Sequence, residues 1–145
     1  MSISWAHHAI DTLRGAVYVM GGQNHNEQGN MHVISECEAF DLDSESWIPI
    51  PNMWTARYDA SCCWFGDKKI YVFGGYTTTG LTDSIEAYNV EEYQWESLSV
   101  KLAKPLSLPC CIQNKENSIL VMGGLNEEWI SEQAAHTIED SNLVK

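Results

Sequence analysis

Three apolar segments of the chain each end in a pair of glycines, and they recur at a nearly constant spacing. The pairs are Gly21–Gly22, Gly74–Gly75 and Gly123–Gly124, so their first glycines lie 53 (74 − 21) and 49 (123 − 74) residues apart. Self-similarity at such a period is typical of repeat architectures, in which each unit buries its apolar surface against its neighbours. The chain is therefore expected to fold as an array of similar units rather than around one central core.

Further residues keep the same register relative to the glycines. An aromatic residue precedes a tryptophan by 7 positions in the first two units, as Phe40 and Trp47 and as Tyr88 and Trp95 (47 − 40 and 95 − 88). The polar residues between each aromatic residue and its tryptophan predict a hairpin turn. Together with the apolar runs, this pattern predicts four short strands in each complete unit.

The glycine pairs indicate where the backbone is crowded. Glycine adopts positive φ readily and allows another chain segment to approach closely. We expect the aromatic residue and the tryptophan to stand on neighbouring strands, where their rings can cover these glycines. A four-stranded antiparallel sheet cannot bury both of its faces alone, so such sheets stack radially into a β-propeller. The predicted fold is therefore all-β.

This set of motifs resembles the kelch repeat family over nearly the whole chain. The resemblance implies a propeller whose blades are four-stranded antiparallel sheets. Residues 50–53 followed by Arg57 are similar to the family's linker between blades, whereas the second linker has Lys104–Pro105 where the family commonly has arginine. The residues that carry the structural motif are Gly21, Gly22, Phe40, Trp47, Gly74, Gly75, Tyr88, Trp95, Gly123 and Gly124.

The repeat count limits how much of a propeller the chain can form. The expected blades cover residues 5–53 and 58–100, and a partial blade covers residues 107–145. In the third unit, aligning Ile138–Glu139 with Ile85–Glu86 puts Ser141 at the position of the aromatic residue. About two and a half blades cannot close a ring, since propellers have about 4–8 blades. The chain is expected to be a piece or isoform of a longer protein, or a subunit that self-associates to complete the ring.

Composition favours a folded intracellular protein. Apolar residues make up 44% of the chain, and no apolar run is long enough to serve as a signal peptide or a membrane span. The five cysteines are an odd number and do not suggest a secreted disulfide framework. We therefore expect a cytoplasmic location, with the nucleus as the alternative, and no membrane partner.

The acidic side chains fall mainly in predicted turns and loops. A net charge of −12 is consistent with a solvated rim, and the alternative is a partner that carries a basic patch. Nucleic acid is not an expected partner, because the chain offers no cationic surface for phosphates.

No cofactor, metal site or catalytic residue is expected. The adjacent cysteines at 62–63 and 110–111 recur at the same place in the repeat, which favours buried strand residues over metal ligands. No pair of cysteines has the C-x-x-C spacing of common zinc sites, and the five histidines are scattered. Motifs for a nucleophilic serine or for nucleotide phosphates are also missing from the sequence.

Loops that connect rigid strands are the expected place for binding. Tryptophan, tyrosine and arginine often anchor protein interfaces. Alternatives stay open for three candidates: Trp54 and Tyr58 could pack on the adjacent blade, and Arg57 could hydrogen-bond loop carbonyl groups. The candidate partner-binding residues are Trp54, Arg57, Tyr58, Tyr76, His25, Glu27 and His32.

The family resemblance implies a non-catalytic protein-interaction module. Such modules commonly form the substrate-recognition part of cullin-type ubiquitin ligase adaptors, or they bind actin and other scaffolds. An enzyme of the kelch-propeller type, such as a sugar oxidase or epimerase, is the alternative. Helical BTB and BACK segments in a longer parent chain would favour the adaptor, and a bound metal or ligand would favour the enzyme.

Overall fold

The computed structural model describes residues 7–114, 118–131 and 135–139, and these residues form strands, turns and loops without a helix. The first of three large antiparallel sheets has the order β1-β2-β3-β4. Its strands are β1 (Ala9–Leu13), β2 (Ala16–His25), β3 (Met31–Asp41) and β4 (Ser46–Ile50).

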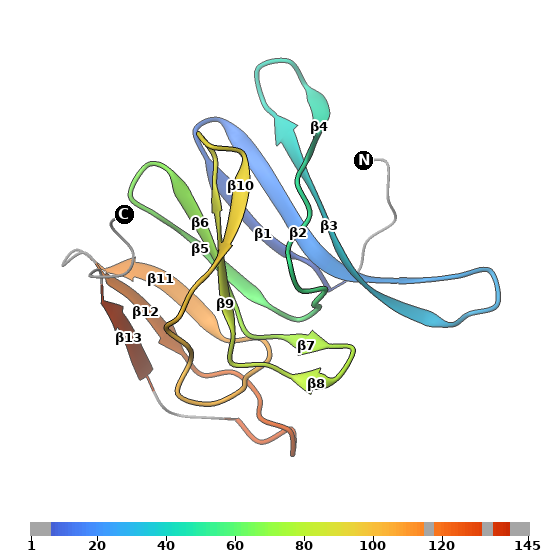
Figure 1. The fold of residues 1–145 in the computed structure, drawn as a ribbon, viewed down its shortest axis with the longest axis vertical. Coiled ribbons are helices and arrows are strands. Elements are labelled where there is room, and N and C mark those ends of the chain that lie inside the picture. The colour runs from blue at the N-terminus through green and yellow to red at the C-terminus, as the bar shows by residue number, and fades with distance from the viewer. Residues whose placement is uncertain (1–6, 115–117, 132–134, 140–145) are drawn as a thin grey trace.

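The second sheet repeats this arrangement, and the third has three strands within the described residues (Figure 1). The second sheet has the order β10-β9-β6-β5, and β7 and β8 form a small separate hairpin. The strands are β5 (Ser61–Phe65), β6 (Lys69–Phe73), β7 (Tyr76–Thr77), β8 (Gly80–Leu81), β9 (Ile85–Asn89), β10 (Gln94–Ser97), β11 (Cys110–Asn114), β12 (Ser118–Met122) and β13 (Ala135–Glu139). The predicted all-β class with four-stranded antiparallel sheets is confirmed, and the described sheets do not close a ring.

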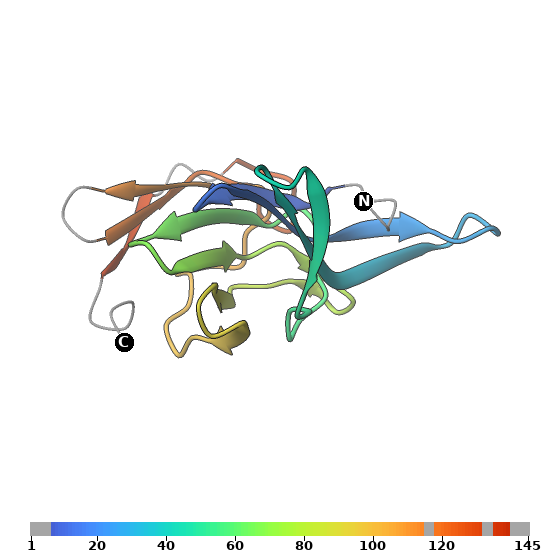
Figure 2. The same ribbon diagram turned by 90° about the horizontal axis from the view of Figure 1, so that it is seen from above.

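The sheets stand beside one another, with β5 in contact with both β1 and β11. These three are the first strands of their units and lie at one edge of each sheet. The β2–β3 hairpin is longer than the other hairpins and extends away from the stack of sheets (Figure 2).

The predicted hairpin of aromatic residue and tryptophan is confirmed. Phe40 pairs with Trp47, and Tyr88 pairs with Trp95, with ring centroids 5.2 and 5.3 Å apart. Their burial differs: Trp95 is buried between the first and second sheets, whereas Trp47 is half-buried on the other face of the first sheet. The difference follows from packing, because among the sheets that the structure describes only the second has a neighbour on both sides.

Two apolar clusters fill the spaces between the sheets. The first includes Tyr18, Met20, Ile70, Tyr88 and Trp95, and the second includes Tyr71, Phe73, Leu106, Ile119 and Ile138. Every residue of β6 and β9 is buried, while β4 and β11 are largely exposed. Among the described residues, the middle sheet therefore supplies the largest share of the core.

The glycine pairs are crowded, but not by the aromatic rings that the sequence suggested. A Cβ on Gly21 would lie 2.5 Å from the carbonyl oxygen of Arg57, and one on Gly75 would lie 2.6 Å from that of Tyr58. The contacting groups are thus backbone carbonyls of the linkers between units: the linker that follows the unit for Gly21, and the linker that precedes it for Gly75. The prediction that the rings cover the glycines is wrong, because the tyrosine–tryptophan hairpin lies farther out in the sheet.

The third unit has a different register from the one proposed from sequence. Ile138 pairs with Ile119, as Tyr88 pairs with Ile70, so Ile138 occupies the position of the aromatic residue instead of Ser141. The alignment by sequence depends on an Ile-Glu dipeptide, whereas strand register follows the burial of alternate side chains, and Ile138 is 4% exposed.

Three residues with positive φ precede the first strands. His7, Asp59 and Leu108 have φ of 56°, 51° and 50°, and each lies two positions before β1, β5 or β11. The Asp59 amide donates to the His7 carbonyl at 2.9 Å, and the Leu108 amide donates to the Asp59 carbonyl at 2.7 Å. This hydrogen-bonded belt links the entries of the three first strands.

Candidate functional site

The loops after the glycine pairs project from one end of the sheets, where the linkers between units also lie (Figure 1). Tyr58, in the first linker, and Tyr76, in β7, exchange two backbone hydrogen bonds of 3.0 and 2.8 Å. Ser107 and Leu125 do the same one unit later, with bonds of 2.9 and 2.8 Å. Each linker is therefore fixed to the loop of the unit that follows it.

Three aromatic rings from this end of the molecule stack in a row. The Tyr58 and Tyr76 centroids are 5.3 Å apart with an interplanar angle of 18°, and the Tyr76 and Trp129 centroids are 5.8 Å apart with an angle of 29°. The His7 ring meets Tyr58 edge-on at 6.3 Å. We call Tyr58, Tyr76 and Trp129 the aromatic row. It crosses from the second unit to the third, and its last member is 67% exposed.

The loop that carries Trp129 has a close counterpart in the first unit. The side chain of Asn126 accepts hydrogen bonds from the amides of Glu128 and Ile130, at 2.9 and 3.0 Å. Asn26 caps the β2–β3 turn in the same way, and there the position of Trp129 is taken by Gly29. Both residues have positive φ, 58° for Trp129 and 80° for Gly29. Positive φ is uncommon for a bulky residue, and residues held in such conformations often occur at functional sites.

The surroundings of the aromatic row are acidic. Glu127 and Glu128 precede Trp129 and are exposed. The Asp59 carboxylate, next to Tyr58, lies 2.7 Å from Nδ1 of His7. Burial raises the pKa of Tyr58, and the charge of Asp59 raises it further. The row is therefore an aromatic strip that is half-buried at Tyr58 and Tyr76, exposed at Trp129, and flanked by acidic residues.

Arg57 is not available to a partner, which corrects the prediction that it binds one. Its side chain is 0% exposed, and its guanidinium donates to Oε1 of Glu86 at 2.7 Å. It also donates to the carbonyl groups of Gly74 and Ser84, at 2.9 and 3.1 Å, and to Oγ of Ser84 at 2.9 Å. Arg57 therefore hydrogen-bonds loop carbonyl groups, which was the alternative expected from the sequence. Burial lowers the pKa of Arg57, and the nearby Glu86 carboxylate opposes this effect.

Glu86 extends this buried contact to the linker itself. Its carboxylate accepts hydrogen bonds from the amides of Trp54 and Thr55, at 2.8 and 3.1 Å. In the next unit, the hydrogen-bond pattern puts Leu106 at the position of Arg57, and the strand register puts His136 at that of Glu86. Both members of the ion pair are thus replaced together, and the arginine position corresponds to Leu106 rather than to Lys104.

The other predicted site residues are spread over different regions. Trp54 is 74% exposed, and its indole N–H donates to the Trp95 carbonyl at 3.1 Å, away from the aromatic row. His25, Glu27 and His32 are exposed on the long β2–β3 hairpin. Of the predicted set, Tyr58 and Tyr76 are the members that belong to the aromatic row. Sequence reasoning missed Trp129, although the correspondence of its loop to the Gly29 turn could have revealed it.

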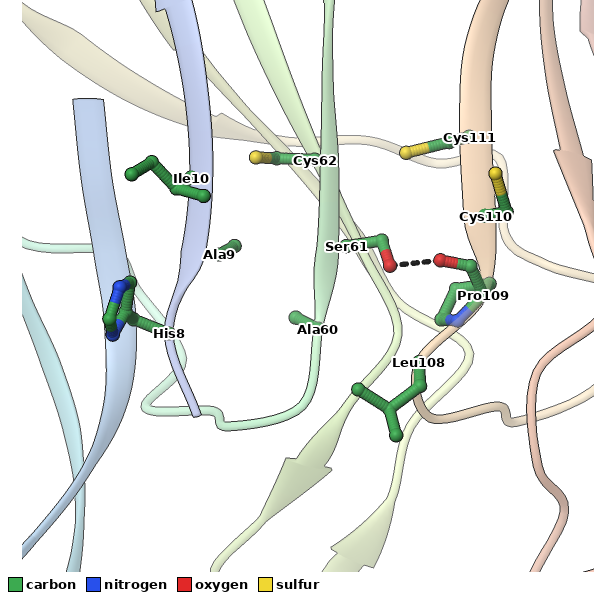
Figure 3. Close-up of a pocket in the computed structure, with 10 residues that line it drawn as sticks. All are labelled: His8, Ala9, Ile10, Ala60, Ser61, Cys62, Leu108, Pro109, Cys110 and Cys111. Atoms are coloured by element: carbon green, nitrogen blue, oxygen red, sulfur yellow. Dashed lines mark hydrogen bonds between the residues drawn. The ribbon is translucent and has the colours of Figure 1, made fainter. Parts of the chain in front are cut away.

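A groove lies where the first strands of the three units meet (Figure 3). This groove has a volume of about 450 Å³ and is lined by small, apolar and thiol-bearing side chains of β1, β5 and β11 and of the residues that precede them. Of the described residues that line it, His8 is the only basic one, and burial lowers the pKa of that imidazole. Among the described residues, no group of three or more His, Cys, Asp or Glu could hold a metal ion.

No helix in the described part of the chain is long and apolar enough to cross a membrane.

Comparison with known proteins gives a consistent assignment. The family model of the Kelch motif matches residues 4–53 and 56–99. Beta-scruin of Limulus polyphemus is 32% identical over 131 residues, covering 86% of this chain and 14% of the relative. Human Kelch-like protein 23 is 31% identical over 121 residues, covering 81% of this chain and 20% of the relative. Human Kelch domain-containing protein 10 is 29% identical over 136 residues, covering 84% and 29%.

The chain thus spans less than a third of the length of each of these relatives. The matched motif covers more than half of the chain, and its two matched segments correspond to the first two sheets. The three-sheet architecture, the crowded glycine pairs and the Phe40–Trp47 and Tyr88–Trp95 hairpins agree with this assignment. The chain therefore belongs to the kelch repeat family.

Proposed function

We propose that the chain is a protein-interaction module that binds a partner through the aromatic row. The observation that carries this proposal is Trp129, which is exposed, has positive φ where the equivalent turn has Gly29, and extends a stack of rings. A stacked row of rings offers a rigid apolar surface, and tryptophan and tyrosine are frequent anchors of interfaces.

The chemistry around the row favours a partner segment with arginine or lysine side chains. Glu127 and Glu128 supply negative charge beside the rings, within a chain of net charge −12. Cationic side chains are attracted to the faces of aromatic rings as well as to carboxylates. His25, Glu27, His32 and Trp54 remain candidates for a wider contact surface.

The test is to select, from a library of displayed linear peptides, those that bind the chain. The affinity of the selected peptides is then measured for the wild type and for matched variants. Trp129→Gly is the informative variant, because glycine accepts this φ and the fold should keep its stability. We expect peptides rich in arginine and lysine whose affinity falls by about 30-fold in Trp129→Gly, the usual loss for an interface anchor. Tyr93→Ala is the control, since Tyr93 is equally exposed, also has positive φ, and lies in a turn at the opposite end. Equal affinity for the wild type and Trp129→Gly would refute the proposal.

Two more specific roles would belong to a longer protein that contains this chain. The kelch resemblance supports a role as the substrate-recognition part of a cullin-type ubiquitin ligase adaptor, and an actin or scaffold binder is the alternative. Both roles are consistent with a non-enzymatic module in the cytoplasm, with the nucleus as the alternative location. Co-purification of the parent protein with a cullin would support the adaptor, and co-sedimentation with actin filaments would support the scaffold binder.

Self-association is a further part of the proposal. The outer face of the first sheet carries Phe40 and Trp47, and the outer face of the third sheet carries Ile112. The equivalent faces of the second sheet are covered by the neighbouring sheets. Another unit of the same kind would bury them, and a second copy of the chain could supply it. Light scattering after size-exclusion chromatography tests this: a defined oligomer supports it, and a stable, cooperatively folding monomer refutes it.

A further inference from the structure

Four of the five cysteines lie on the two neighbouring strands β5 and β11. Alternation along the strand directs Cys62 toward the first sheet, where it packs on the first apolar cluster, and Cys63 toward the third sheet, in the second cluster. Cys111 packs on the second cluster from the other side. Cys63 and Cys111 therefore meet at the boundary between the second and third units, which we call the β5/β11 seam.

The two thiols face each other across this seam. Both cysteines pack in the second apolar cluster and line the same groove. The Cys63 thiol in turn lies 3.2 Å from the carbonyl oxygen of Trp64. Figure 3 shows the Cys111 side chain pointing from β11 toward β5, while Cys62 points to the far side of β5.

The seam is open to small molecules. A groove of about 320 Å³ is lined by residues that include both Cys63 and Cys111. Cys63 itself is 5% exposed, and Cys111 is half-buried. A small oxidant can therefore reach the pair more easily than a bulky thiol reagent can.

We propose that Cys63 and Cys111 are an oxidation site at which hydrogen peroxide forms a reversible disulfide between the second and third units. The Cys63 thiolate attacks one peroxide oxygen, the O–O bond breaks, and Cys63 sulfenic acid and hydroxide result. The sulfur of Cys111 then displaces the sulfenic hydroxyl and forms the S–S bond. The two thiols lose two electrons and two protons, and the peroxide leaves as two water molecules.

The electrostatics agree with this division of roles. The neighbouring Cys111 thiol lowers the pKa of the Cys63 thiol despite its burial, which favours Cys63 as the attacking thiolate. The neighbouring Cys63 thiol and burial raise the pKa of Cys111, so its thiol keeps the proton until the sulfenic acid has formed.

Oxidation would change the connection between the units that share the aromatic row. The two cysteines lie 48 residues apart (111 − 63), so the bond would close a loop containing β6 to β10. Tyr76 and Trp129 lie on opposite sides of the same boundary. The disulfide would therefore restrict the relative motion of two members of the row.

The experiment treats the reduced 145-residue chain with hydrogen peroxide, alkylates the remaining thiols, and maps disulfides by mass spectrometry of non-reduced peptides. We expect three alkylated thiols out of five (5 − 2), a Cys63–Cys111 peptide, and full recovery of the five thiols with dithiothreitol. Cys63→Ser and Cys111→Ser should abolish this bond. The matched controls Cys62→Ser and Cys110→Ser, one residue away on the same strands, should retain it.

Oxidation in concentrated urea provides the test for folding. The denatured chain should give a mixture of pairings, because no contact then favours one pair. Three results would overturn the proposal: a dominant bond that involves Cys62 or Cys110, no disulfide in the folded chain, or the same mixture of pairings with and without urea. The outcome does not depend on whether the aromatic row binds a partner.

Discussion

Replacing Arg57 by leucine should destabilise the protein far more than removing an exposed cation does. The guanidinium makes four hydrogen bonds, one of them to the carboxylate of Glu86, which is 1% exposed. Removing the guanidinium leaves the buried Glu86 carboxylate without a counter-charge, although this carboxylate keeps two backbone amide donors. Breaking a buried ion pair from one side costs about 3–5 kcal/mol. Leucine occupies the equivalent position at Leu106, so the shape of the side chain is compatible with the site.

The measurement is equilibrium unfolding in urea, followed by tryptophan fluorescence. With a urea dependence of about 2 kcal/mol/M, a loss of 3–5 kcal/mol lowers the midpoint by roughly 1.5–2.5 M. The double variant Arg57→Leu/Glu86→Gln should be more stable than the sum of the single effects by about 1–3 kcal/mol, because the amide removes the charge but still accepts hydrogen bonds. The control Lys101→Ala, whose partner Asp83 forms an exposed pair, should change stability by less than about 0.5 kcal/mol. A loss of less than about 1 kcal/mol in Arg57→Leu, or strictly additive effects, would refute the reasoning.

Two further predictions concern a glycine pair and a buried phenol. Gly74→Ala should cost more than about 3 kcal/mol, because its Cβ would collide with a backbone carbonyl, whereas Gly66→Ala should cost about 1 kcal/mol for its φ of +65° alone. Similar urea midpoints for these two variants would contradict the role assigned to the close approach. Burial raises the pKa of Tyr88 to about 12, above the value of about 10 expected in the unfolded chain. The resulting stability is complete below about pH 10 and is lost as the pH rises through about 12, since ionisation favours the unfolded chain. Tyr88→Phe should therefore flatten the pH dependence of unfolding between about pH 10 and 12, and an unchanged slope would contradict it.

Much of the fold follows from local sequence patterns. The apolar runs predict β2, β6 and β12, and the seven-residue spacing predicts the two outer hairpins, because alternation and turn chemistry act over a few residues. The glycine pairs also predict crowded backbone. These features depend on neighbours along the chain, so a single sequence is enough to identify them.

The candidate site was harder to predict, because its parts come from separate units. Tyr58 and Tyr76 could be proposed as binding residues one at a time, but their stacking with Trp129 depends on how each linker pairs with the following loop. Arg57 shows the same limit. Its side chain is committed to Glu86, a partner 29 residues away (86 − 57) that is identified only when the sheets pack together.

The sequence by itself therefore determined the repeat, the strand order within each unit and the kelch-type architecture, since all three depend on periodic patterns of residue type. The tertiary structure alone decided which side chains are buried and which are free. It buried Trp95 but left its counterpart Trp47 half-exposed, enclosed Arg57, and brought Cys63 against Cys111. The physical reason is that equivalent positions of a repeat share a local conformation but not their neighbours, and burial, pairing and reactivity depend on the neighbours.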